Sequence, residues 1–310
     1  LISSIGRRIE LFELGLARNG QPIGAFLLTG DPGVGKTLTG NATAEFLHGN
    51  PNAVIHIAGE HFALQHEIAK LKGAPPGYLG HRETTPIITQ AKLNSITSET
   101  SRISVVIVDE LDKSHPQMSE HFLDALQKAR WALGDNSIVN CERCLFFFTA
   151  NFGSEKRRKS EKWGFVKKFD GAATSNDLAK GVHPAFLDRI EALGGIHDFP
   201  EMSDDVRERI IYKTLKESEK HLKERLKIRV ALEFSEELYQ ICMRGTTGRN
   251  VAAKVKDSVD EMCIENAKLL TKFTGNEKDL SKNIRWVINP DFSVKQVVTK
   301  NKSFTAGEGV

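Results

Sequence analysis

Several classes of protein are excluded by what this sequence has little of. Only four of its 310 residues are cysteine, too few for a disulfide framework, and this usage favours a reducing compartment, with the cytoplasm as the default location. No apolar run approaches the roughly 18 residues that a membrane helix needs, so no membrane partner is expected. The formal net charge is only +3, so composition gives no reason to expect nucleic acid as the main partner.

Two of the cysteines form a C-x-x-C pair, CERC at 141–144, which raises the question of a zinc site. A second pair with this spacing is missing, because Cys242 and Cys263 stand 21 residues apart and the histidines are scattered. CERC also runs directly into the apolar LFFF, as the start of a strand would. We therefore interpret these cysteines as structural.

Four short apolar runs predict buried strands, with helix-like segments between them. This alternation is typical of a parallel α/β sheet that is covered on both faces. The runs are 25–29 (AFLLT), 53–57 (AVIHI), 103–108 (ISVVIV) and 144–149 (CLFFFT). We predict that they belong to one large α/β domain over residues 1–199.

The composition and the periodicity of the sequence change after Pro200. Long, charged, helix-periodic segments follow, the first of them over 203–227. They predict a second, smaller and mostly helical domain over 200–275. Residues 276–310 are expected to contribute a strand, NIRWVI, and a mobile C-terminal tail.

The segment GDPGVGKT, residues 30–37, lies between a predicted strand and a predicted helix and matches the pattern G-x-x-x-x-G-K-[ST]. Glycines let backbone N–H groups surround the β-phosphate, Lys36 reaches the β- and γ-phosphates, and the Thr37 hydroxyl binds Mg²⁺. A glycine-rich turn without this function would leave Lys36 and Thr37 unexplained. We expect ATP and Mg²⁺ as cofactors, and the predicted nucleotide-binding residues are Gly30, Asp31, Pro32, Gly33, Val34, Gly35, Lys36, Thr37 and Leu38.

An acidic pair, Asp109 and Glu110, ends the apolar run of VVIVDELDK at 105–113, where open α/β sheets place their ligand chemistry. Asp109 would hold Mg²⁺ through water, and Glu110 would orient and deprotonate the attacking water. Such a pair alone is often only a helix cap, but combined with the phosphate loop it indicates a hydrolase site. Asn151, at the end of FFFTAN, either holds that water from the other side or serves as a turn former.

With these motifs in place, the chain resembles an AAA+ ATPase of the Clp unfoldase type, most like the second ATPase module of ClpA, ClpB and ClpC. The resemblance covers about residues 1–270. Its markers, in family order, are GAPPGYLG, DELDKSHPQMSEHFLDALQ, TANFGS and HPAFLDRIEAL. It implies a three-layer P-loop AAA+ domain followed by a helical lid, six subunits in a ring, and polypeptide as the substrate.

In that family GAPPGYLG, residues 73–80, is the pore loop. The resemblance implies that Tyr78 packs against an extended polypeptide in the central channel, with Gly77 and Gly80 letting the loop move and Leu79 completing the contact. An aromatic side chain suits this role because it offers contact area at a small cost in rotamer entropy. Judged from the residues alone, a surface turn with Tyr78 packed inward is the favoured interpretation of this segment.

Two arginines correspond to nucleotide-sensing positions of the family. Arg189, in FLDRI, matches the arginine finger that reaches the γ-phosphate of the neighbouring subunit, although a salt bridge to Asp188 or Glu191 is the alternative. Arg249, in TTGRN, stands where the family carries a Gly-Ala-Arg sensor at the start of a lid helix. Here that motif is degraded.

The basic segment 155–168 contains Trp163-Gly164-Phe165, similar to the aliphatic-Gly-Phe/Leu tripeptide with which ClpA and ClpC dock onto a barrel-shaped peptidase. Trp replaces the usual aliphatic residue. Exposed aromatic side chains favour a binding role, whereas the alternative is that both fold back onto the domain.

The leading functional hypothesis is an ATP-driven protein unfoldase or translocase that works as a homohexameric ring, either feeding a Clp-type peptidase or acting as a chaperone or disaggregase. One alternative is an AAA+ nucleic-acid remodeller or loader, which only the basic run 156–168 favours. The other is a nucleotide-gated assembly that binds ATP without hydrolysing it. The intact set of Lys36, Asp109, Glu110 and Arg189 argues against that alternative.

Overall fold

A computed structural model of the chain describes residues 1–73, 85–151, 182–226, 230–245, 247–265 and 284–298. The chain divides into two compact units, Leu1–Glu201 and Met202–Val310, each of which is described by itself. None of the helices in the described ranges combines the length and the apolar character that a bilayer crossing requires.

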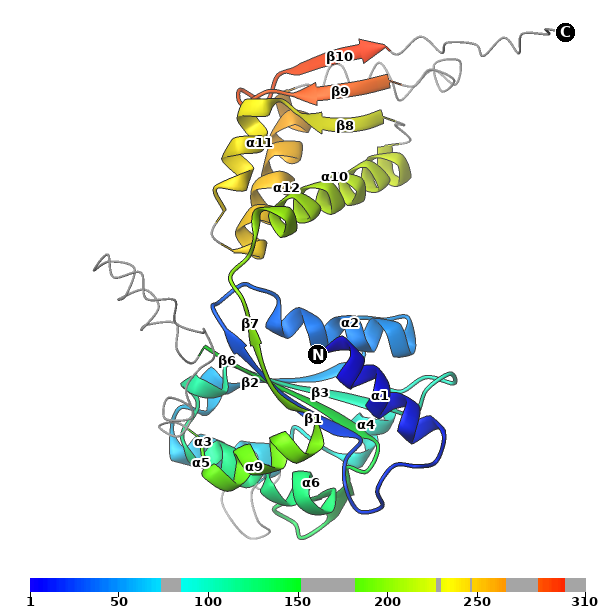
Figure 1. The fold of residues 1–310 in the computed structure, drawn as a ribbon, viewed down its shortest axis with the longest axis vertical. Helices are drawn as coiled ribbons and strands as arrows, with labels where there is room; N and C mark the ends of the chain where they lie inside the picture. The colour runs from blue at the N-terminus through cyan, green and yellow to red at the C-terminus, as the bar shows by residue number, and fades with distance from the viewer. Residues whose placement is uncertain (74–84, 152–181, 227–229, 246, 266–283, 299–310) are drawn as a thin grey trace, which may run out of the picture. The chain divides into compact units, whose positions relative to one another are not determined.

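The first unit is built on a five-stranded sheet in the order β2-β3-β6-β1-β7, and every neighbouring pair is parallel (Figure 1). The strands are β1 (Gly24–Gly30), β2 (Val54–Ala58), β3 (Ser104–Asp109), β6 (Cys144–Ala150) and β7 (Gly195–Phe199). Four of them coincide within one residue at each end with the predicted apolar runs, and the predicted α/β fold class is confirmed. β7 was not predicted, because GIHDF is only partly buried and lacks an apolar run.

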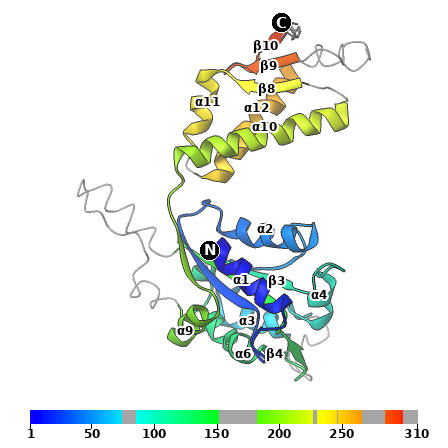
Figure 2. The ribbon, with the colours of Figure 1, turned by 45° about the vertical axis from the view of Figure 1, so that its right-hand side comes forward.

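Helices cover both faces of this sheet (Figures 1 and 2). Alternate side chains of each strand point to opposite faces, so Phe26 and Leu28 pack beneath α1 (Ile2–Glu13) and α2 (Lys36–His48), whereas Ala25 and Leu27 face the other helical layer. That layer contains α3 (Gln65–Lys72), α4 (Gln90–Ser95), α5 (Gln117–His121), α6 (Leu123–Lys128) and α9 (Pro184–Leu193). The three layers bury β1, β3 and β6 almost completely, and the polar groups of the candidate site lie at the carboxyl ends of these strands.

Two short 3₁₀ helices and a hairpin complete the first unit. The 3₁₀ helices η1 (Gly59–Phe62) and η2 (Leu111–Lys113) follow β2 and β3, and the hairpin consists of β4 (Arg130–Ala132) and β5 (Ile138–Asn140). CERC follows β5 directly and ends in the first residue of β6, and both Cys141 and Cys144 are buried free thiols. A hydrogen bond with Cys141, together with burial, raises the pKa of the Cys144 thiol well above its usual value. Both observations favour the structural interpretation of this pair.

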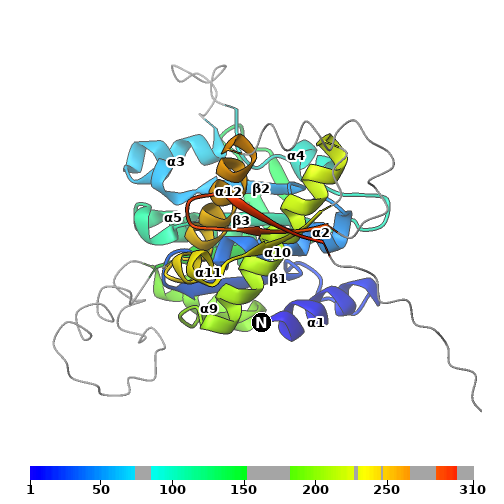
Figure 3. The ribbon, with the colours of Figure 1, turned by 90° about the horizontal axis from the view of Figure 1, so that it is seen from above.

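The second unit combines three helices with a three-stranded sheet in the order β10-β9-β8. Its elements are α10 (Asp204–Leu226), β8 (Val230–Phe234), α11 (Glu236–Met243), α12 (Gly248–Glu265), β9 (Ile284–Ile288) and β10 (Val294–Val298). α10 and α12 pack together and lie against one face of the sheet (Figures 2 and 3). Trp286 and Ile288 of β9 are buried in the same core as Val251 and Val255 of α12, so the strand expected after residue 276 is part of this unit.

Candidate nucleotide site

The phosphate loop occupies the turn between β1 and α2, at the carboxyl end of β1. Gly30, Gly33 and Gly35 have φ values of 135°, 80° and 106°, a region that favours glycine. Gly40 brings α2 close to the sheet, since a Cβ at this position would lie 2.6 Å from Ile107 Cδ1. The predicted glycines of the loop therefore allow the tight turn, and Gly40, which was not predicted, allows the close approach of the helix whose N-terminal end follows the loop.

Lys36 is folded over this loop and is only 7% exposed. Its Nζ donates to Gly30 O, Asp31 O and Asn151 Oδ1, each at 2.8 Å, so all three ammonium protons are used. Burial lowers the pKa of Lys36, while Asp112, Asp109 and other carboxylates act in the opposite direction. The structure thus brings Asn151 to the phosphate loop, although these residues are 115 positions apart.

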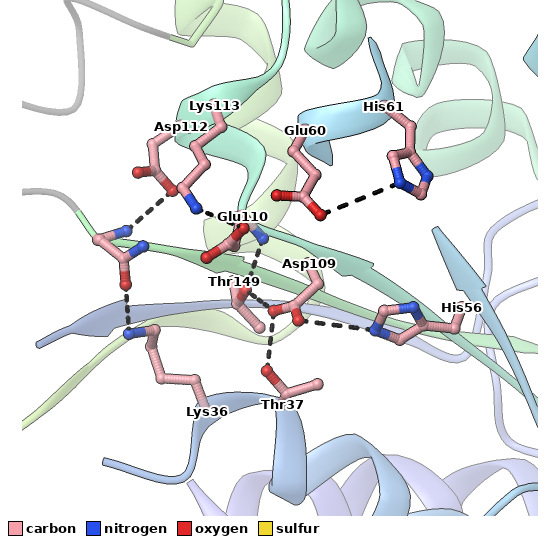
Figure 4. A network of polar contacts seen from close by, with 11 residues as sticks. Lys36, Thr37, His56, Glu60, His61, Asp109, Glu110, Asp112, Lys113 and Thr149 are labelled. Carbon is pink, nitrogen blue, oxygen red and sulfur yellow. Dashed lines mark hydrogen bonds and ion pairs between the residues drawn. The ribbon is translucent and has the colours of Figure 1, made fainter. Parts of the chain in front are cut away.

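Asp109, at the end of β3, is held from several sides (Figure 4). Its Oδ1 accepts a hydrogen bond of 2.8 Å from the Thr37 hydroxyl and a short one from Thr149 Oγ1. His56 Nε2 of β2 lies 3.6 Å from Oδ2. A hydroxyl and a carboxylate side by side are oxygen ligands that suit Mg²⁺, so Thr37 and Asp109 fit the ion that the sequence implies.

Glu110 adopts a left-handed backbone, with φ 54° and ψ 49°, which is uncommon for a residue other than glycine. Its N–H donates to Thr149 Oγ1 at 2.9 Å, and its Oε2 accepts from Lys113 Nζ at 2.7 Å (Figure 4). Gly59 leaves room for this turn, because a Cβ there would lie 2.4 Å from Glu110 O. The turn points a partly exposed carboxylate away from the strand while its neighbour Asp109 faces Thr37.

Asn151 follows β6, and its N–H donates to Asp112 Oδ1 at 3.0 Å. Sequence reasoning missed Asp112, Thr149, His56 and Lys113 as members of this network. Thr149 could have been identified from its position near the end of a predicted strand, two residues before Asn151.

A substitution at Thr149 tests whether this hydroxyl holds the acidic pair. Thr149→Val keeps the side-chain shape but leaves the Glu110 N–H without its partner and removes one of the hydrogen bonds to Asp109, so we expect the free energy of unfolding to fall by about 1–3 kcal/mol and ATP turnover to fall with it. Denaturant unfolding and steady-state hydrolysis measure both effects. Thr149→Ser retains the hydroxyl and is the matched control. A Val variant as stable and as active as the Ser variant would contradict this role.

The two predicted arginines belong to other elements than the residues of this network. Arg189 is a half-buried residue of α9, and within the described residues it forms no ion pair with Asp188 or Glu191. Arg249 is exposed in the first turn of α12, in the other unit. The predictions at Gly77, Tyr78, Leu79 and Gly80 and at Trp163, Gly164 and Phe165 lie outside the described residues.

Residues 21–193 match the family model described as the AAA domain (Cdc48 subfamily). The chain belongs to this family. Together with its relatives this makes it a Clp-type AAA+ ATPase, as predicted. ClpE of Streptococcus pneumoniae, named as the ATP-binding subunit of an ATP-dependent Clp protease, is 26% identical over 90% of this chain and 36% of its own length. The chaperone protein ClpB of Oceanobacillus iheyensis is 27% identical over 71% of this AAA+ chain and 28% of its own length.

A solved structure supports the fold of this AAA+ chain over almost its whole length. It is a closed-state cryo-EM reconstruction of Hsp104 with ATPγS and FITC casein, with a TM-score of 0.68 and 20% identity over 96% of this chain and 48% of that one. At this identity the match speaks for the fold alone. The chain spans about a third of the length of the ClpE relatives.

Proposed function

We propose that this AAA+ chain hydrolyses ATP to pull on and unfold polypeptide, as one subunit of a homohexameric ring. The observation that carries the proposal is the convergence of Lys36, Thr37, Asp109, Glu110 and Asn151 at the carboxyl end of the parallel sheet, where α/β folds bind ligands. The carboxylates of Asp109 and Glu110 contact different partners there, as is required if one of them binds the metal and the other acts as the base.

The proposed roles follow from these contacts. Lys36 would meet the β- and γ-phosphates after giving up at least one present acceptor, and the Asn151 side chain is the one most easily exchanged. Thr37 and Asp109 would hold Mg²⁺, which neutralises phosphate charge when bound. Glu110 would accept the proton of the attacking water once its carboxylate turns from Lys113 toward the site. The Asn151 side chain, in exchange for its contact with Lys36, would orient that water.

The polypeptide substrate and the cytoplasmic location are proposed from the family. A chaperone, ClpB, and an Hsp104 reconstruction that includes casein are among the similar proteins. In this proposal Tyr78, between Gly77 and Gly80, grips the polypeptide together with Leu79, and Arg189 acts on the γ-phosphate of the neighbouring subunit. Arg249 is proposed as the lid residue that senses the same nucleotide.

A peptidase partner is a further part of the proposal. It is supported by relatives named as ATP-binding subunits of an ATP-dependent Clp protease. The docking element would be Trp163-Gly164-Phe165, with aromatic side chains as anchors.

Hydrolysis stimulated by unfolded polypeptide tests the gripping role. We expect an unfolded casein to increase steady-state ATP turnover of the native chain, and Tyr78→Ala to lose most of that increase while basal turnover stays. Tyr78→Phe is the matched control, because it keeps the aromatic contact area and removes only the hydroxyl. A Tyr78→Ala variant that responds to casein as the native chain does would exclude this role, and stimulation by single-stranded DNA in place of casein would favour the nucleic-acid alternative.

A further inference from the structure

A cavity of about 320 Å³ lies at the end of β1 opposite to the phosphate loop. α1 and the segment that joins it to β1 form its walls. Pro22 and Ile23, which line the cavity, precede the first residue of the strand, whereas the phosphate loop follows the last. The strand holds the two places roughly 20 Å apart, so this cavity is separate from the candidate nucleotide site.

Three arginines line this cavity: Arg7 and Arg8 from α1, and Arg18 from the following segment. Arg8 is half-buried and its Nη2 donates to Ala192 O of α9 at 2.8 Å, which holds α1 beside the end of that helix (Figure 3). Burial lowers the pKa of Arg8, and the charges of Arg18 and Arg7 lower it further. Within the described part of the chain no carboxylate pairs with any of the three. Their mutual repulsion is therefore not compensated by the protein itself.

The segment that carries Arg18 is tied down near both ends. The Leu16 N–H donates to Leu11 O at 2.8 Å, which folds the segment back over the end of α1, and the Gly20 N–H donates to Glu142 Oε1 at 2.9 Å. Arg18 is thus presented by an anchored segment opposite the two arginines of α1. A site arranged before its ligand arrives loses less conformational entropy on binding.

The remainder of the lining is largely apolar, with Leu11, Pro22 and Ile23 among its residues. We propose that the cavity binds a small organic phosphate, whose phosphoryl group meets the three guanidiniums and whose apolar part lies on this wall. A phosphoryl dianion balances the charges of several neighbouring arginines better than a single carboxylate does, and guanidinium binds phosphate oxygens in a bidentate manner. The cavity volume lies at the lower end of the range for small-molecule sites. This inference does not depend on the proposed unfoldase function.

Calorimetric titration with phenyl phosphate, inorganic phosphate and benzoate tests this site. The titration is done on a Lys36→Gln variant so that binding at the phosphate loop does not contribute to the signal. It is repeated on the native chain with saturating Mg-ADP for the same reason. We expect phenyl phosphate to bind more tightly than inorganic phosphate or benzoate, since it alone has both a phosphoryl group and an apolar ring. Arg18→Gln should weaken it about tenfold or more, because one charge-assisted contact is lost.

Arg130→Gln is the matched control, because it removes the same charge from an exposed arginine of the same unit outside the cavity. Arg7 and Arg18 are exposed, so their substitution should leave the melting temperature unchanged. Equal weakening by Arg18→Gln and Arg130→Gln, or no binding of phenyl phosphate, would overturn the proposal. If benzoate binds as tightly as phenyl phosphate, the proposal that the site recognises a phosphoryl group is overturned. If a short oligonucleotide binds more tightly than phenyl phosphate, the proposal that the ligand is a small molecule is overturned.

Discussion

Replacement of Glu110 by Gln is expected to lower ATP turnover by about 10²–10⁴-fold, the usual contribution of a general base, while nucleotide binding remains. The amide keeps the size of the carboxylate and can still accept from Lys113, so the left-handed turn at residue 110 is preserved. What it loses is the ability to take a proton from water. Single-turnover hydrolysis and titration with a fluorescent nucleotide separate the two properties.

Glu60→Gln is the matched control for this substitution. Glu60 lies on η1 near the same network and is more exposed than Glu110, and its substitution changes local charge by the same amount (Figure 4). We expect its turnover to stay within about twofold of native, as for a surface change away from the reacting atoms. If the two variants lose equal activity, the effect belongs to local charge and not to a base at Glu110. If Glu110→Gln loses nucleotide binding, its assignment as the base is also contradicted.

Loss of Arg189 is expected to have a comparable or larger effect, since an arginine finger contributes about 10³–10⁵ in rate. Its helix is a rigid support: Phe186 and Ile190 are buried in the core, and β7, directly after α9, pairs with β1. Gly194 allows this close packing, because a Cβ there would lie 2.4 Å from Ala25 O. With no ion pair to Asp188 or Glu191 in the described structure, Arg189→Ala should leave the melting temperature nearly unchanged while hydrolysis is lost.

Mixing the two inactive variants decides whether Arg189 acts across a subunit boundary. In a ring that contains both, an Arg189→Ala subunit supplies an intact Glu110 and a neighbouring Glu110→Gln subunit supplies an intact Arg189. Some sites are then complete, so we expect turnover to reappear on mixing. An equal mixture that stays inactive, although the variants co-assemble, would contradict a finger acting in trans. A fall in melting temperature for Arg189→Ala would instead favour the structural salt bridge.

Much of the site could be predicted because its chemistry depends on short motifs. Lys36 and Thr37 stand at a fixed spacing from the glycines of the loop, and Asp109 and Glu110 directly follow a strand that its β-branched residues make recognisable. Asn151 was placed at a strand end by the same reasoning, and the structure brings its side chain to Lys36.

The remaining contacts depend on pairing between distant strands, which no local pattern encodes. Val108 of β3 pairs with Phe148 of β6, and this register sets the next residues, Asp109 and Thr149, beside each other. A shift by one residue would turn Thr149 to the opposite face. The strand after residue 276 was predicted, but its pairing into a sheet of the second unit was missed for a similar reason, since β8 and β9 are some 50 residues apart in the sequence and neither strand indicates its partner.

The measurement that tests the ring mechanism most directly is ATP turnover per chain as a function of protein concentration. If each site needs Glu110 from one subunit and Arg189 from the next, turnover per chain should rise steeply with concentration and then level off as rings fill. Sedimentation of the same samples should show assembly over the same range. Turnover per chain that is constant from the monomer upward would contradict shared sites, and with them the central claim that this AAA+ chain works as a ring.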